Sequence, residues 1–75
     1  MPRYFFHTRH KDGWLVPDHV GAMHDSDEAV AVEAVYRSRD LLMRGFEGGL
    51  VEVHDEGGWV VISKLIGARP TDRTR

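Results

Sequence analysis

The sequence predicts an α+β domain with two layers and the order ββαββ: a four-stranded, mainly antiparallel sheet with one helix packed on one face. The main observation is that two stretches typical of β-strands precede, and two follow, a long stretch with the apolar spacing of a helix. The sequences "DG" and "DEGG" separate the members of each strand pair, as hairpin turns would. A chain of 75 residues is long enough for one small domain only.

The first two strands are predicted from "RYFFHTR" and from residues 14–16. Aromatic residues and threonine favour extended structure, and Asp12-Gly13 favours a hairpin turn because glycine readily takes positive φ. Pro17 cannot donate to a ladder, so the second strand is expected to be short or at an edge. Alternation places Tyr4, Phe6 and Thr8 on one face of the first strand and Phe5, His7 and Arg9 on the other.

A helix is predicted from residue 27 to Gly45, after a turn and a short extended piece at residues 22–24. Asp25 or Ser26 can cap its first turn, and Asp25 with Glu28 resembles a capping box. The expected apolar stripe contains Val30, Ala31, Ala34, Val35, Ser38, Leu41 and Leu42. The other side is expected to be mostly charged, through Glu33, Arg37, Arg39, Asp40 and Arg44.

Residues 50–54 and 59–65 predict the last two strands, which complete a domain at residues 1–67. Residues 68–75 are polar, contain Pro70 and three arginines, and are expected to form a disordered basic tail.

One helix can cover only one face of this sheet, yet both faces carry apolar residues. Tyr4, Phe6, Val51, Val53, Val60 and Ile62 are expected to meet the helix. The opposite face is then an apolar cluster with a charged rim, which is typical of an interaction site. The expected surface consists of Phe5, His7, Arg9, Glu52, His54, Trp59 and Val61.

We expect this surface to form a homodimer, because a domain this small often gains stability from a partner subunit. The alternative is a weak single-stranded nucleic-acid binder that stacks bases on Phe5 and Trp59 near arginine side chains. The net charge of −2 weighs against it. So does the balance of −4 in residues 1–68, which hold 7 basic and 11 acidic groups.

No metal, cofactor or catalytic role is expected. The chain has five histidines, and His7, His54 and Glu52 could meet on one face, but a closed zinc site needs a fourth ligand. There is no cysteine, no phosphate-binding glycine loop and no serine at an exposed strand-to-helix turn. The sequence contains neither a signal-peptide pattern nor an apolar run that could span a bilayer, so a cytoplasmic protein without membrane contact is expected.

The chain resembles a family of short, uncharacterised bacterial proteins that begin with PRYFF, a domain of unknown function. The resemblance rests on "MPRYFFH", "PDHVG", "DEAVAVEAVYRSRDLL" and "VEVHDEGGWVVISKL", and covers about residues 1–65. The pair Gly57-Gly58 departs from the family pattern, which has a single glycine in the last turn. The resemblance implies the architecture and no activity.

Overall fold

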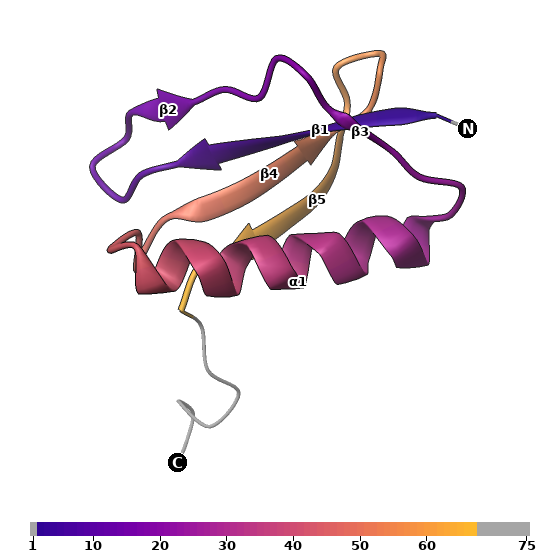
Figure 1. Ribbon diagram of the computed structural model, residues 1–75. Helices are drawn as coiled ribbons and strands as arrows, with labels where there is room; N and C mark the ends of the chain where they lie inside the picture. The colour runs from indigo at the N-terminus through magenta and orange to yellow at the C-terminus, as the bar shows by residue number, and fades with distance from the viewer. Residues whose placement is uncertain (1, 68–75) are drawn as a thin grey trace.

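The computed structural model describes residues 2–67 and has one helix against an antiparallel sheet (Figure 1). The α+β class and the single helix are therefore confirmed. The sheet has five strands, because the short extended piece before the helix also pairs. In chain order the elements are β1 (Arg3–Arg9), β2 (Leu15–Val16), β3 (Ala22–Met23), α1 (Asp27–Met43), β4 (Leu50–His54) and β5 (Val60–Leu65). The predicted tail at residues 68–75 lies outside the described residues.

Strand β1 is the centre of the sheet, whose order is β2-β1-β4-β5, with β3 also paired to β1. Strand β2 pairs with Thr8 and Arg9, and β3 pairs with Arg3 and Tyr4. The two short strands therefore pair with opposite ends of β1, and the segment between them is not paired with it as a strand. Pro17, which has no N–H to give to a ladder, stands where the first of these short pairings ends.

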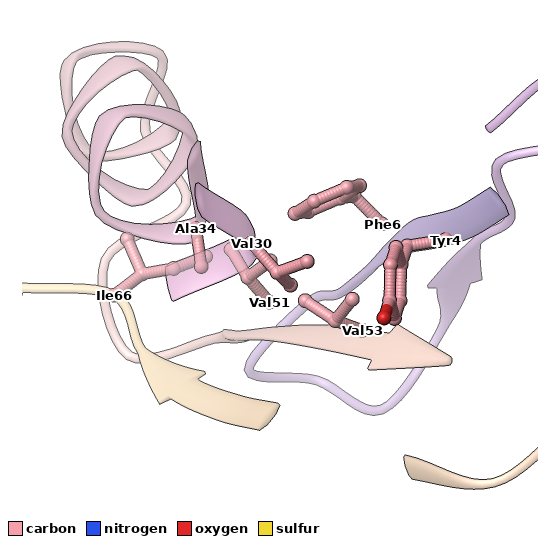
Figure 2. Packing of buried hydrophobic residues seen from close by; sticks show 7 residues of the cluster. All are labelled: Tyr4, Phe6, Val30, Ala34, Val51, Val53 and Ile66. Carbon is pink, nitrogen blue, oxygen red and sulfur yellow. The ribbon is translucent and has the colours of Figure 1, made fainter. Parts of the chain in front are cut away.

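The core lies between α1 and one face of the sheet (Figure 2). Its buried apolar side chains are Tyr4, Phe6, Val30, Ala34, Val51, Val53 and Ile66. The predicted alternation in β1 and β4 is confirmed, since the residues between these positions are only partly buried. Seven side chains make a small core, as expected for a domain of this size.

Helix α1 begins at Ser26, whose Oγ accepts a hydrogen bond from the amide of Ala29 at 3.1 Å. Ser26, rather than Asp25, is thus the N-cap, and the acidic Asp27 and Glu28 lie in the positive first turn. The helix ends at Arg44, and Gly45 follows with φ of 93°, a conformation that favours glycine.

A β-bulge shifts the register between β4 and β5. Val53 pairs with Ile62, but His54 pairs with Val60, so Val61 is an extra residue. Cross-strand partners share a face, so Val60 lies on the face of His54 and not, as expected, on the helix side. Trp59 precedes β5 and belongs to the turn.

Candidate interaction surface

The sheet face turned away from α1 is defined by the strand register. Odd-numbered residues of β1 pair with Leu50, Glu52 and His54, and these pair in turn with residues of β5. At the other edge, Leu15 pairs with Arg9. We call this surface the open face; it consists of Phe5, His7, Arg9, Leu15, Leu50, Glu52, His54, Val60, Ser63 and Leu65.

An ion pair occupies the middle of the open face. The Nε of Arg9 donates to Oε2 of Glu52 at 2.9 Å, and Nη1 of Arg9 donates to the carbonyl of Gly13 at 3.1 Å. The hydrogen bond from Arg9 holds the pKa of Glu52 below its usual range. The two charges therefore neutralise each other within the chain.

Two histidines lie next to this ion pair. The rings of His7 and His54 meet edge to face with centroids 4.6 Å apart, and the ring of Phe5 lies parallel to His7 at 6.4 Å. The Nε2 of His54 is buried without a hydrogen-bond partner among the described residues, 3.6 Å from Oε1 of Glu52. Burial and the neighbouring His54 lower the pKa of His7. Both effects favour the neutral form of His7.

Asp18 anchors the loop that joins β2 to β3. From the sequence, this residue was expected only to form part of a turn. Its Oδ2 accepts from the amide of Phe6 at 3.1 Å, in the gap on β1 between the two short strands. Its Oδ1 accepts from the amides of Val20 and Gly21, each at 3.0 Å. Although burial raises the pKa of Asp18, these three amides hold it below its usual range. The sequence signal was an Asx turn in "PDHVG", but the long-range bond to Phe6 has no local signature.

The backbone of Asp18 also ties this loop to the open face. Its amide donates to Nδ1 of His7 at 3.0 Å. Nδ1 of His7 therefore carries no proton, and the proton of the neutral ring is on Nε2. Protonation of His7 would break the bond to Asp18.

The structure brings together five of the seven residues expected at the interaction surface: Phe5, His7, Arg9, Glu52 and His54. Trp59 lies in the β4–β5 turn, where its amide donates to Oδ1 of Asp55 at 3.0 Å and its side chain is 75% exposed. Val61 lines a pocket with Asp27, Val30 and Ile62, beside α1. The bulge is the physical reason that Val61 departs from the expected alternation.

Apolar side chains at both ends of the open face were missing from the expected surface. Leu15 and Leu65 lie at opposite edges of one row, with Arg9 and Leu50 between them, and Val60 lies in the row of His54. Leu15, Val60 and Leu65 are all exposed. Their alternation could have indicated them, but their assignment depended on the register of β2 and on the bulge in β5.

The open face does not have the geometry of a metal centre. Within residues 2–67, no group of three or more histidine, cysteine, aspartate or glutamate side chains is arranged to hold an ion. The pair His7 and His54 lies close to Glu52, but Oε2 of Glu52 is engaged by Arg9.

Comparison with known families identifies the family of the chain. A family model described as a domain of unknown function, DUF6894, matches residues 3–64. The chain belongs to this family. The matched segment contains every strand residue of the DUF6894 fold described above except Leu65, and all of α1.

Comparisons with curated proteins and with solved structures identify no function for this chain. No curated protein and no solved structure matches it significantly. In the part of the chain that is described, no helix combines the length and apolar character needed to cross a bilayer.

Proposed function

We propose that the chain is a protein-interaction module that forms a homodimer by packing its open face against the open face of a second copy. The observation that carries the proposal is the exposure of Leu15, Val60 and Leu65 on the sheet face that α1 does not cover. Exposed apolar residues grouped on one face are typical of interaction sites.

The polar centre of the open face is compatible with burial. Arg9 and Glu52 already pair with each other, so a partner need not supply a counter-charge to either. Burying an unpaired charge would cost far more than burying this hydrogen-bonded pair. A twofold axis through the centre also lets the same residues meet on both copies, as an isologous interface requires.

The size of the open face sets the expected affinity. Four strands about 4.8 Å apart and about five residues long give a flat area of roughly 19 by 17 Å. Stable interfaces bury about 800 Å² on each partner, so this contact is small. At about 25 cal/mol per Å², a few hundred Å² of apolar surface would contribute several kcal/mol before the cost of association. We therefore expect a micromolar dimer.

Sedimentation velocity over a range of concentrations tests the proposal. The variant Leu65→Glu adds a charge at an exposed position of the open face and should lose the association made through that face, so it should form smaller species than the wild-type chain at the same concentration. Ala31→Glu adds the same charge at an exposed position of α1 and is the matched control. A wild-type chain that is monomeric throughout, or a Leu65→Glu variant that associates like the control, would contradict the proposal.

The alternative of single-stranded nucleic-acid binding has weaker geometric support. Arg9 is engaged by Glu52, and Trp59 projects from a turn rather than from the sheet. Single-strand binders need free positive charge next to their stacking residues. Amide shifts in β1 and β5 on titration with short single-stranded RNA or DNA at low salt would favour this alternative.

We propose no catalytic activity and a cytoplasmic location. The charged groups of the open face, Arg9 and Glu52, are engaged with each other, and the absence of cysteine suits a reducing compartment. Fractionation of cells that express a tagged chain would test the location.

A further inference from the structure

The outward face of α1 differs from its sequence-based expectation. Charged residues were expected there, but Val32, Tyr36 and Met43 are exposed by 53%, 64% and 87%. At about 100° per residue, these three lie within about 40° of one another and opposite the buried Val30 and Ala34. The helix thus has a second apolar stripe on the side that faces away from the sheet.

Two of the charged residues expected on this face, Glu33 and Arg37, make contacts on another side of the helix. Glu33 accepts from Nε2 of His24 at 2.5 Å and from Nε of Arg37 at 2.6 Å. The guanidinium of Arg37 lies 4.5 Å from the centre of the Phe6 ring. His24, Glu33 and Arg37 therefore cover the side of the core next to β1. The outermost line of the helix is left to Val32, Tyr36 and Met43, with Arg39 among them.

The spacing of the outward stripe suits a helix–helix contact. Ala29, Val32, Tyr36, Arg39 and Met43 follow one another at intervals of three, four, three and four residues. This heptad spacing produces a straight seam along one helix against another. In Figure 1, α1 lies along one side of the fold with the sheet on its other side.

The charges of α1 are divided along its length. Its N-terminal half contains the acidic Asp27, Glu28 and Glu33 and no basic residue. Its C-terminal half contains Arg37 and Arg39, with Asp40 as the one acid, and Arg44 follows as the C-cap. Two such helices attract each other when antiparallel, because each acidic half then lies beside a basic half. Parallel helices would place like charges together.

Two charges close to the stripe are available for such pairing. Arg39 and Glu28 are exposed, and neither forms an ion pair within residues 2–67. The only exposed ion pair along the helix joins Arg44 to Asp40, among the residues that the structure describes.

We propose that the outward face of α1, formed by Ala29, Val32, Tyr36, Arg39 and Met43, pairs in antiparallel fashion with the same face of a second copy of the chain. With the twofold axis beside the midpoint of Val32 and Tyr36, Tyr36 of each copy faces Val32 of the other. Arg39 then faces the small Ala29, with Glu28 next to it. The contact is independent of the open face, because it uses the opposite layer of the domain.

Charge reversal tests this pairing without disturbing the core. Arg39→Glu places like charges together at two symmetry-related points and should weaken association about tenfold. Glu28→Arg should have a similar effect for the same reason. The double variant Glu28→Arg/Arg39→Glu restores opposite charges and should return the affinity to that of the wild type. Far-ultraviolet circular dichroism checks that each variant is folded.

The test is made in the Leu65→Glu background, where the open face can no longer contribute. Concentration-dependent association is expected there, and Tyr36→Glu should abolish it. A monomeric Leu65→Glu chain, or a double reversal that associates no better than either single variant, would overturn the inference. The proposed function fails on a different result. It would be contradicted if the Tyr36→Glu chain and the Tyr36→Glu/Leu65→Glu chain associated equally well.

Discussion

Replacing Asp18 by alanine should remove most of the stability of the domain, although the residue lies in a surface loop. Its carboxylate accepts hydrogen bonds from the amides of Phe6, Val20 and Gly21. These bonds close the gap between β2 and β3, and with the bond from the Asp18 amide to His7 they hold the loop against β1. The substitution leaves three amides without their acceptor.

The magnitude follows from the surroundings of each amide. The amide of Phe6 belongs to a buried residue of the central strand, and an unsatisfied buried donor costs about 1–3 kcal/mol. The amides of Val20 and Gly21 can turn to water, so each loses about 0.5–1 kcal/mol. The total of roughly 2–5 kcal/mol is a large part of the ~5 kcal/mol expected for a small domain. Asp18→Asn keeps an acceptor oxygen and should cost about half as much.

Urea unfolding followed by tryptophan fluorescence and circular dichroism measures this loss. Asp40→Ala is the control, because Asp40 forms an exposed ion pair with Arg44 and should contribute less than about 1 kcal/mol. Equal midpoints for Asp18→Ala and Asp40→Ala would refute the reasoning. The pKa of Asp18 is lowered in the fold, so its stabilisation is present above the unfolded pKa and is lost as the pH falls through the folded pKa. The Asp18→Ala variant should lack this acid-dependent loss.

Three further results are expected. The pKa of His7 is lowered in the fold, so the unfolded chain binds a proton at this residue more readily than the folded chain does. The urea midpoint should therefore fall as the pH drops below about 6.5, and this dependence should be weaker in His7→Gln. Gly49→Ala should destabilise the fold more than Gly13→Ala in thermal unfolding, because a Cβ at Gly49 would lie 2.3 Å from the carbonyl oxygen of Arg9. A Cβ at Gly13 would meet nothing within 4 Å, so Gly13→Ala should cost only the strain of its positive φ of 103°. Ser26→Ala should cost about 1 kcal/mol in urea unfolding through the lost helix cap, and Ser26→Asp should restore most of it.

The elements of the fold could be predicted because each has a local signature. The run from Asp27 to Met43 has acidic residues at its start, a glycine soon after its end and no proline. The alternation of side-chain direction along a strand identified Tyr4 and Phe6 as the buried residues of β1. The extended piece at residues 22–24 was also expected, but its pairing with β1 was not, because a strand of two residues has no periodicity that indicates a partner.

The candidate surface was predicted less completely, because two of its determinants are long-range. The bulge at Val61 depends on how β5 fits β4, and it changes which valine accompanies His54. The outward stripe of α1 was hidden because Glu33 and Arg37 were expected to face solvent. They turn instead to His24 and Phe6, which are distant in sequence.

The two proposed contacts lie on opposite layers, and this has a consequence for assembly. Each contact is isologous and would by itself close a dimer. A chain that uses both continues beyond two copies, forming a tetramer if the two axes meet at right angles and an alternating linear stack if they do not. Tyr36→Glu or Leu65→Glu alone should therefore limit the assembly to a dimer, and together they should give a monomer.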